Sequence, residues 1–353
     1  MTKKVMVVFG TRPEVIKLAS FIKELQKDTL FIPILVNSGQ HLNMTKQMLE
    51  LFNLKADYEL KIMKEKQSLS KMLKSILNKL NPIVKSEKPD VMVSFADTST
   101  AFGAALCAYY NKIPILHMEG GIRSYNKYDC YPEEGNRRLI DHLADWNTCQ
   151  TQLDLKRLYK ENIKNGIFVG NYSLDVVKDF AHGLQTKKIV LITMHRREAW
   201  GEPIKQACKA IKSLSKRFKD HLFIVSKHPN PIVSETIDKT LSDFDNIKLL
   251  DALNYDAFIK LMASSKVVMT DSGGIVQEAM FLRKPIIYLR EKSEYEYLFI
   301  APYFVSVGKN KLKIFYNTKK LLEMETIDTP EIKDFGNGTA GKQTLEYLKR
   351  VLK

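Results

Sequence analysis

Several segments of the sequence place charged side chains beside glycine or proline, directly after a short apolar run. The first is Phe9–Lys17, which contains Gly10, Arg12 and Pro13. Glycine permits a tight turn, a helix that starts at the proline offers free backbone N–H groups, and Arg12 adds a fixed positive charge. These features favour an anion-binding site, although a plain turn with a surface arginine and a snorkelling Lys17 fits the same residues.

Two carboxylates follow later apolar runs. Glu119 precedes two glycines, a position that suits a catalytic group beside a flexible loop. Burial of Glu119 in an ion pair with Arg123 or Arg137 is the structural alternative, and the residues favour neither. Asp97 stands where it could simply cap the helix that follows it, and taken alone the cap is the favoured interpretation.

The segment Pro132–Arg138 predicts the start of a charged helix. Proline at the helix start places Glu133 in the first turn. The charges along this helix could form ordinary i,i+4 ion pairs, which contribute about 0.2–0.5 kcal/mol each. These pairs are Glu133–Arg137 and Glu134–Arg138.

The strongest single indication of a ligand site is the segment Thr270–Ile275, in which Ser272 precedes Gly273 and Gly274. A strand that ends in two glycines before a helix brings backbone N–H groups close to a phosphate or pyrophosphate. Glu278, one turn further on, could accept hydrogen bonds from a ribose. A glycine turn before a helix is the structural alternative.

Two more polar segments follow expected strands in the second half of the chain. Met194–Glu198 contains His195, Arg196 and Arg197, which would extend cations beyond the strand end. His228 also follows a strand. A lone histidine is more often a structural residue, but its placement leaves a structural and a functional role equally open.

Short apolar runs alternate with longer amphipathic segments, which predicts parallel sheets covered by helices on both faces. The first series of expected strands is Val5–Phe9, Phe31–Val36, Val91–Phe95, Ile113–Met118, Asp145–Cys149 and Ile167–Val169. The second series is Ile189–Thr193, His221–Ser226, Ile247–Leu250, Val267–Thr270 and Pro285–Tyr288. We therefore expect an α/β protein with two Rossmann-like domains, 1–175 and 176–341, that face a cleft beyond the carboxyl ends of their strands.

The segment Gly336–Gly341 matches the dinucleotide pattern G-x-G-x-x-G literally. No strong strand leads into it, and no βαβ unit can follow it, so a dinucleotide site is excluded there. The pattern predicts a glycine turn before a final helix at 342–351, which could pack back on the first domain. The sequence offers no other credible site for a nicotinamide, and we expect no cofactor.

Composition excludes several other classes of protein. The 353 residues carry a formal charge of +15, but Arg supplies only 11 of the 55 cations, and no nucleic-acid motif is present. The four cysteines form no metal-binding spacing, so we expect no metal and reduced thiols in a cytoplasmic protein. No apolar stretch approaches the 18 residues of a membrane span.

Together, in order, four motifs resemble those of the non-hydrolysing UDP-N-acetylglucosamine 2-epimerases: Gly-Thr-Arg-Pro-Glu, Pro-Glu-Glu-x-Asn-Arg, His-Arg-Arg-Glu and Asp-Ser-Gly-Gly-Ile. The resemblance covers essentially the whole chain and implies the glycosyltransferase-B fold and a homodimer. It places in the active site Arg12, Lys17, Asp97, Glu119, Glu133, Arg137 and His228. It places beside the nucleotide Phe258, Ser272, Gly273, Gly274 and Glu278.

The chain departs from the family's motifs at several positions. Ala96 and Tyr172 stand where the family has glycine and threonine, Gly120 stands where it has alanine, and Tyr295 stands where it has an arginine that binds the nucleotide sugar. Lys66 replaces an arginine of the activator site that some bacterial members use. Lysine cannot make the bidentate contact of arginine, so we expect weak or absent activation, without a strongly sigmoidal dependence of rate on substrate.

The resemblance implies epimerisation at C2 of UDP-N-acetylglucosamine to UDP-N-acetylmannosamine, by elimination and re-addition of UDP, in the synthesis of surface polysaccharide precursors. Cations would hold the departing pyrophosphate, and carboxylates would move the proton at C2. The same chemistry on a deoxy or uronic acid UDP-N-acetyl sugar is the nearest alternative. A glycosyltransferase on this fold and a non-catalytic nucleotide-sugar sensor are the alternatives from other classes.

Overall fold

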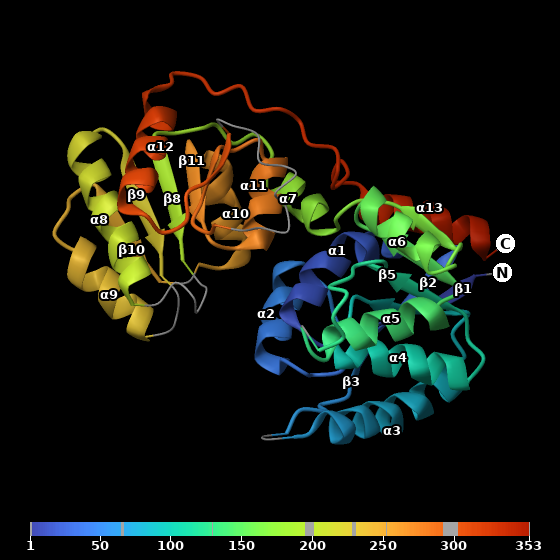
Figure 1. Ribbon diagram of the computed structural model, residues 1–353. Coiled ribbons are helices and arrows are strands. Elements are labelled where there is room, and N and C mark those ends of the chain that lie inside the picture. Colours follow the sequence, from blue (N-terminus) through green and yellow to red (C-terminus); the bar gives the residue numbers. More distant parts are fainter. Residues whose placement is uncertain are drawn as a thin grey trace. The chain divides into compact units, whose positions relative to one another are not determined.

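The computed structural model describes residues 2–64, 67–128, 130–194, 201–227, 231–251, 253–291 and 303–352. The chain forms two compact units, each with its own sheet (Figure 1). Unit 1 consists of Met1–Val176 and Lys333–Lys353, and unit 2 consists of Val177–Ile332. In the described residues, no helix is both long enough and apolar enough to cross a bilayer.

Unit 1 contains a parallel sheet with the strand order β3-β2-β1-β4-β5-β6-β7. Its strands are β1 (Lys3–Phe9), β2 (Phe31–Asn37), β3 (Tyr58–Glu59), β4 (Val91–Phe95), β5 (Ile115–Met118), β6 (Trp146–Cys149) and β7 (Gly166–Phe168). Its helices are α1 (Arg12–Lys27), α2 (Leu42–Leu51), α3 (Leu69–Glu87), α4 (Ser99–Tyr110), α5 (Glu133–Leu143), α6 (Gln152–Lys160), α7 (Ser173–Ala181, which continues into unit 2) and α13 (Ala340–Val351). The central strands are mostly apolar and buried along their length, as expected for a parallel sheet that is covered on both faces.

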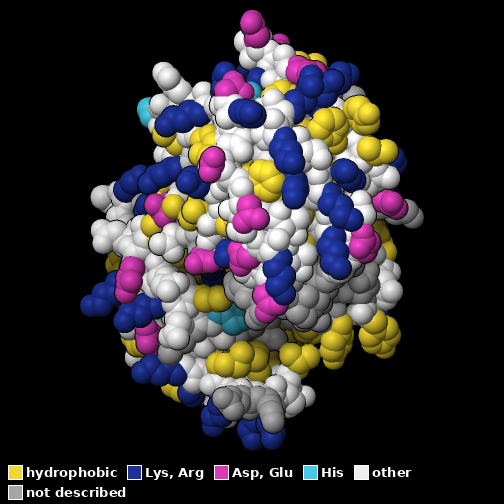
Figure 2. Space-filling view, turned by 90° about the vertical axis from the view of Figure 1, so that its left-hand side faces the viewer, with side chains coloured by type: hydrophobic (Ala, Val, Ile, Leu, Met, Phe, Trp, Pro, Cys, Tyr) yellow, Lys and Arg dark blue, Asp and Glu magenta, His cyan; other side chains and the backbone are white. Residues whose placement is uncertain are grey.

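Unit 2 repeats the same strand order, as β10-β9-β8-β11-β12-β13. Its strands are β8 (Ile189–Thr193), β9 (Leu222–Ser226), β10 (Ile247–Leu250), β11 (Val267–Thr270), β12 (Ile286–Tyr288) and β13 (Phe304–Ser306). Its helices are α8 (Glu202–Arg217), α9 (Pro231–Leu241), α10 (Tyr255–Ser264), α11 (Gly273–Phe281) and α12 (Lys311–Glu323). Figure 2 shows one face of the molecule, on which Lys and Arg are spread among Asp and Glu and do not form one basic patch.

The last helix of the chain, α13, belongs to unit 1 and packs against α1. The Asp175 carboxylate accepts hydrogen bonds from the first two backbone N–H groups of α13, at 2.9 and 2.8 Å. The buried Tyr172 hydroxyl bridges the hydroxyls of Thr148 in β6 and Thr344 in α13, at 2.7 Å each. The Tyr172 phenol is thus a structural link between the sheet and the final helix.

We expect Gly341→Ala to destabilise unit 1 by about 1–3 kcal/mol, the usual cost of forcing a methyl group into a packed contact. A Cβ at position 341 would lie 2.6 Å from Ser20 Oγ and 2.7 Å from the backbone nitrogen of Phe21. Gly135→Ala is the matched control, because Gly135 lies inside α5 and an added Cβ there meets nothing within 4 Å. Gly135→Ala is expected to raise the free energy of unfolding by about 0.5–1 kcal/mol. Urea unfolding measures both, and effects of the same sign would contradict the packing argument.

The four cysteines are free thiols, and three of them are buried. Burial raises the pKa of the Cys107 thiol to about 11 and that of the Cys208 thiol to about 12, and it also raises the pKa of Cys149. Cys130 is exposed. We expect a disulfide reagent at pH 8 to modify Cys130 rapidly in the native protein and the other three thiols only after denaturation. Cys130→Ser should remove the fast phase; its persistence would contradict the assignment.

Candidate functional site

The candidate residues of unit 1 follow three neighbouring strands. β1 pairs with β4, and β4 pairs with β5, all in parallel, so their carboxyl ends meet at one edge of the sheet. Arg12, Asp97 and Glu119 stand in or directly after the loops at this edge. The chain reverses its direction of winding between β1 and β4, and this switch point is where open α/β sheets bind ligands.

Glu14 joins two of these loops. One oxygen of its carboxylate accepts hydrogen bonds from the backbone of Gly10 and from the backbone and hydroxyl of Thr11, at 2.8–2.9 Å. The other oxygen accepts from the Thr98 hydroxyl at 2.7 Å, in the loop after β4. Burial raises the pKa of Glu14, and these hydrogen bonds oppose the rise. Sequence reasoning left Glu14 out of the site, although the capping-box pattern from Thr11 to Glu14 was a signal for it.

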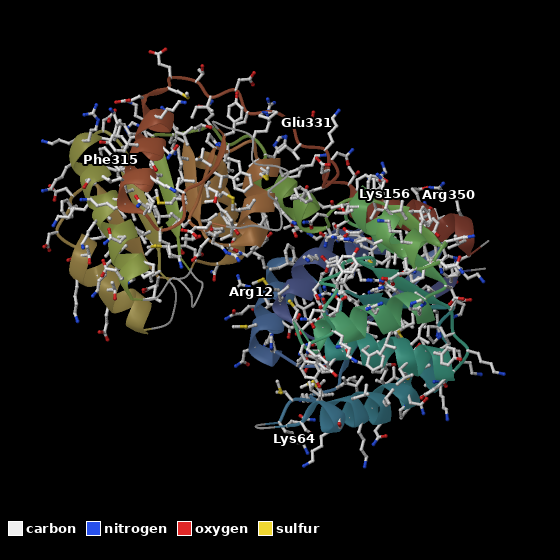
Figure 3. All side chains as sticks on the ribbon, in the orientation of Figure 1. Arg12, Lys64, Lys156, Phe315, Glu331 and Arg350 are labelled. Carbon is white, nitrogen blue, oxygen red and sulfur yellow. The ribbon has the colours of Figure 1, made fainter. Side chains whose placement is uncertain are left out.

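Arg12 is the first residue of α1, and Figure 3 labels its side chain there. It is half-buried. Its guanidinium forms no hydrogen bond or ion pair with any residue that the structure describes. A cation without a carboxylate partner, beside the N-terminus of a helix, is suited to an anionic ligand.

Glu119 is buried and forms an ion pair with Lys17 of α1. Desolvation raises the pKa of the Glu119 carboxyl, and the Lys17 ammonium opposes the rise. The Lys17 ammonium also lies 5.8 Å from the centre of the Phe95 ring, at the end of β4. The structural alternative that pairs Glu119 with Arg123 is wrong, because Arg123 binds Asp141 instead, at 2.7 Å. Arg137 makes no ion pair with Glu119; its guanidinium binds other carboxylates.

Asp97 is held by Arg137, whose Nε lies 3.0 Å from Asp97 Oδ2 and whose second nitrogen contacts the same oxygen. Asn136 donates a hydrogen bond to the Asp97 backbone carbonyl at 2.9 Å. Asp97 does not cap α4. Thr98 does, because its hydroxyl accepts from the backbone N–H of Ala101 at 3.1 Å. The prediction that Asp97 caps α4 is therefore wrong, because the cap is the next residue. The Asp97 carboxylate forms the ion pair with Arg137 instead.

The two expected i,i+4 pairs of α5 are also wrong. Arg137 reaches Asp97 across the sheet edge and contacts Glu134 at i,i+3, at 3.3 Å. Arg138 lies 4.0 Å from Glu161. Glu133 is the first residue of α5, as expected, and forms no ion pair or hydrogen bond within the described part of the chain.

In unit 2 the loop that contains Ser272 joins β11 to α11, and we call it the Ser272 loop. It lies at the corresponding switch point of the sheet, between β8 and β11. Thr193 and Thr270, at the ends of these strands, share a hydrogen bond of 2.8 Å, and Thr270 accepts from the Ser272 backbone N–H at 3.1 Å. α11 then begins at Gly273, and the Ser272 side chain does not cap it. Gly274 is exposed, and nothing lies within 4 Å of where its Cβ would be.

Two other candidate residues of unit 2 lie on helices beside this loop. Glu278 of α11 accepts a hydrogen bond from the Tyr255 hydroxyl at 2.8 Å, and Phe258 of α10 is half-buried. The candidates that lie outside the described residues are His195, Arg196, Arg197, His228, Tyr295 and Lys66. Their roles stay predictions.

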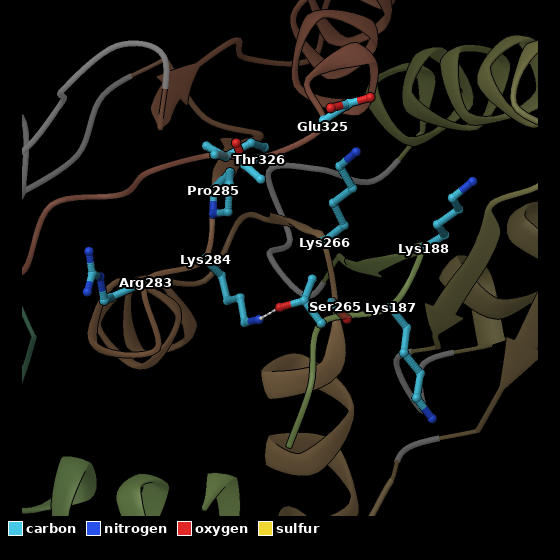
Figure 4. A pocket seen from close by; sticks show the side chains of 11 residues that line it. Lys187, Lys188, Ser265, Lys266, Arg283, Lys284, Pro285, Glu325 and Thr326 are labelled. Carbon is cyan, nitrogen blue, oxygen red and sulfur yellow. Dashed lines mark hydrogen bonds between the residues drawn. The ribbon is translucent and has the colours of Figure 1, made fainter. Parts of the chain in front are cut away.

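A separate cavity of about 400 Å³ lies at the amino ends of the unit 2 strands (Figure 4). Its lining includes Lys187, Lys188, Lys266 and Lys284, and the Lys284 ammonium donates to the Thr186 hydroxyl at 2.8 Å. Desolvation lowers the pKa of Lys284 to about 8. None of the candidate residues that the structure describes lines this cavity, which is at the opposite edge of the sheet from the Ser272 loop.

Two parallel α/β units with this strand order place the chain in the glycosyltransferase-B fold class. The family model described as UDP-N-acetylglucosamine 2-epimerase matches residues 23–349, so the chain belongs to that family. The UDP-N-acetylglucosamine 2-epimerase of Neisseria meningitidis is 36% identical over 98% of this chain and 99% of that protein. That of Bacillus subtilis is 35% identical over 98% and 94%.

Among solved structures, the UDP-GlcNAc 2-epimerase from Neisseria meningitidis bound to UDP-GlcNAc is similar over 98% of this chain and 100% of that one. The sequence identity is 36% and the TM-score is 0.80. The resemblance drawn from the motifs and the expected fold class are thereby confirmed.

Proposed function

We propose that this protein interconverts UDP-N-acetylglucosamine and UDP-N-acetylmannosamine without net hydrolysis. Family membership and the names of relatives that match along their full length support this substrate. The observation that carries the chemistry is the pair of carboxylates, Asp97 and Glu119, that follow neighbouring strands and are each held by one cation. Carboxylates fixed in this way are suited to proton transfer at a defined carbon atom.

The reaction needs more than a base, because the proton at C2 has no adjacent carbonyl group. In the proposed path, a carboxylate takes the C2 proton, and the electron pair of that C–H bond forms a C1–C2 double bond. The bond between C1 and the diphosphate oxygen breaks, and its electron pair leaves with UDP. The reverse sequence adds UDP to C1 and delivers a proton to the opposite face of C2.

The candidate residues divide between these tasks. We assign proton transfer to Asp97, Glu119 and Glu133, whereas His228 would hold the departing diphosphate or take part in proton transfer. Arg137 orients Asp97 and Lys17 orients Glu119, and we assign stabilisation of the departing diphosphate to Arg12. For the nucleotide we propose the loop and helix residues of unit 2, which are Phe258, Ser272, Gly273, Gly274 and Glu278.

We also propose that the protein acts as a homodimer and supplies a precursor of surface polysaccharide. Both proposals rest on the resemblance to the family. Light scattering at micromolar concentration tests the first: a mass of about twice 40.6 kDa is expected, and a monomer would remove the claim.

The decisive experiment incubates the protein with UDP-N-acetylglucosamine in heavy water and follows the C2 proton by NMR. Elimination and re-addition should replace that proton with deuterium and produce a manno-configured product, without any acceptor. Absence of both changes would reject this substrate. Exchange in the absence of an acceptor would exclude a glycosyltransferase, and steady turnover would exclude a sensor.

The same chemistry on a deoxy or uronic acid derivative is the second candidate. It is favoured by Tyr295, which stands where the family has an arginine that binds the nucleotide sugar. A panel of UDP-N-acetyl sugars separates the two candidates by kcat/KM. Preference for unmodified UDP-N-acetylglucosamine would eliminate the second.

A further inference from the structure

Beneath the candidate carboxylates lies a fully buried histidine. His117 of β5 stands two residues before Glu119 and has no exposed surface. Its Nδ1 lies 2.7 Å from a carboxylate oxygen of Asp141 in α5, and its Nε2 lies 2.8 Å from the backbone carbonyl oxygen of Ala96. Both ring nitrogens are therefore engaged, on opposite sides of the ring.

The partners of His117 determine its protonation. A carbonyl oxygen and a carboxylate only accept hydrogen bonds, so each ring nitrogen must carry a hydrogen. Asn147 Oδ1, 3.3 Å from Nδ1, is a further acceptor, because the Asn147 amide nitrogen is engaged with Asp141 and Asn165 oxygens. A ring with two N–H groups is an imidazolium.

The charges around the ring support this state. Burial alone would lower the pKa of His117, but Asp141 and the Ala96 carbonyl raise it above its ordinary value. Burial alone would raise the pKa of Asp141, but His117 and Arg123 hold it below its ordinary value. Arg123 binds Asp141 Oδ2 at 2.7 Å and also binds Glu161. The positive charges of His117 and Arg123 are therefore balanced by two carboxylates.

The same pair holds both loops of the candidate site. Ala96 has a positive φ of 57°, which is unfavourable for alanine, and its turn carries Asp97. The Ala96 N–H donates to the Met118 carbonyl at 2.9 Å, while His117 donates to the Ala96 carbonyl, so β5 fixes the turn from both sides. Glu119 also has a positive φ, of 73°. The Asp141 carboxylate accepts from the Gly121 N–H at 3.3 Å, just beyond Glu119.

We propose that His117 and Asp141 are positioning residues. His117, as a permanently charged imidazolium, fixes the Ala96 turn, and its partner Asp141 fixes the loop after Glu119. Neither side chain is assigned a contact with substrate. The catalytic consequence rests on the proposed function, because it assumes that Asp97 and Glu119 transfer the proton. The charge state of His117 does not depend on that assumption, so it can be tested alone.

The first test is nitrogen NMR of the protein labelled with ¹⁵N-histidine. The His117 ring, assigned as the signal missing from His117→Gln, is expected to show two protonated nitrogens from pH 6 to pH 8. Its two N–H protons should exchange slowly with water because the ring is buried. An unprotonated nitrogen at neutral pH would overturn the proposal, whatever the activity of the protein.

The second test compares two amide replacements by their C2 exchange kinetics. The glutamine amide can reach the position of Nε2 and donate to the Ala96 carbonyl, whereas the asparagine amide reaches only the position of Nδ1. His117→Asn is expected to lower kcat by about 10- to 100-fold with little change in KM, the loss typical of a catalytic group displaced by about 1 Å. His117→Gln is expected to recover most of that loss.

The matched control is His221→Asn in unit 2. His221 is also buried and bonded through Nδ1 to an aspartate, Asp220, at 2.9 Å, but it contacts none of the candidate residues that the structure describes. Its kcat should equal that of the unaltered protein. Equal losses in the two His117 variants, or an unchanged kcat in His117→Asn, would overturn the positioning role. If the unaltered protein shows no C2 exchange at all, the proposed function fails while the NMR result still decides the charge state.

Discussion

Glu119→Gln is expected to slow C2 exchange by about 100- to 10,000-fold while the protein stays folded, since proton transfer by a positioned side chain contributes about that much. Glutamine keeps the shape of the side chain but can neither take up the C2 proton as a base nor neutralise Lys17. The measurement is deuterium incorporation at C2 in heavy water, with circular dichroism to confirm the fold.

Glu87→Gln is the matched control for this result. Glu87 also pairs with a lysine of unit 1, Lys4, at 3.0 Å, but at the opposite edge of the sheet. Its substitution should leave the exchange rate unchanged. If Glu119→Gln exchanged at a near-normal rate, the Glu119 carboxylate would be structural, and Glu133 would be the first candidate to replace it in the mechanism.

Asp97→Asn is expected to cause a loss of the same size in turnover. The substitution removes the negative charge that Arg137 holds in place and leaves an amide that cannot act as a base. Because Thr98, and not Asp97, caps α4, the helix should lose little stability. The rate of C2 exchange and the free energy of unfolding are measured on the same preparation.

Thr98→Ala provides the contrast. It removes the cap and is expected to destabilise the protein by about 0.5–2 kcal/mol. If Asp97→Asn instead lowered the free energy of unfolding and kept nearly full turnover, the Asp97 carboxylate would have a structural role only.

The strand–helix alternation predicted most of the fold because the central strands of a covered parallel sheet are continuous apolar runs. β3 and β13 were not predicted, because β3 has only two residues and one of the three residues of β13 is a serine, so neither forms a distinct apolar run. The strand-end rule correctly placed Asp97 and Glu119 at one edge of the unit 1 sheet, since parallel strands expose their carboxyl ends together.

The partners of these carboxylates could not be predicted from local spacing. Lys17 and Glu119 are separated by 102 positions in the chain, and they meet only because β1 and β5 flank β4. The i,i+4 rule favoured Glu133 for Arg137, but a long arginine side chain can also reach a neighbouring loop, and Asp97 lies within that reach. His117 gave no signal in the sequence, because its role depends on backbone groups that only the folded sheet brings to it.

The return of α13 to unit 1 has a consequence for how the protein is made. Unit 2 is one continuous stretch of chain, so it can fold as soon as the ribosome has released it. Unit 1 must wait for its last contacts, because the hydrogen bonds of Asp175 with residues 340 and 341 and of Tyr172 with Thr344 cannot form until those residues have been translated. Most of the candidate acid–base groups lie in unit 1. During synthesis, unit 2, to which we assign nucleotide binding, can therefore be folded while unit 1 still lacks its final helix.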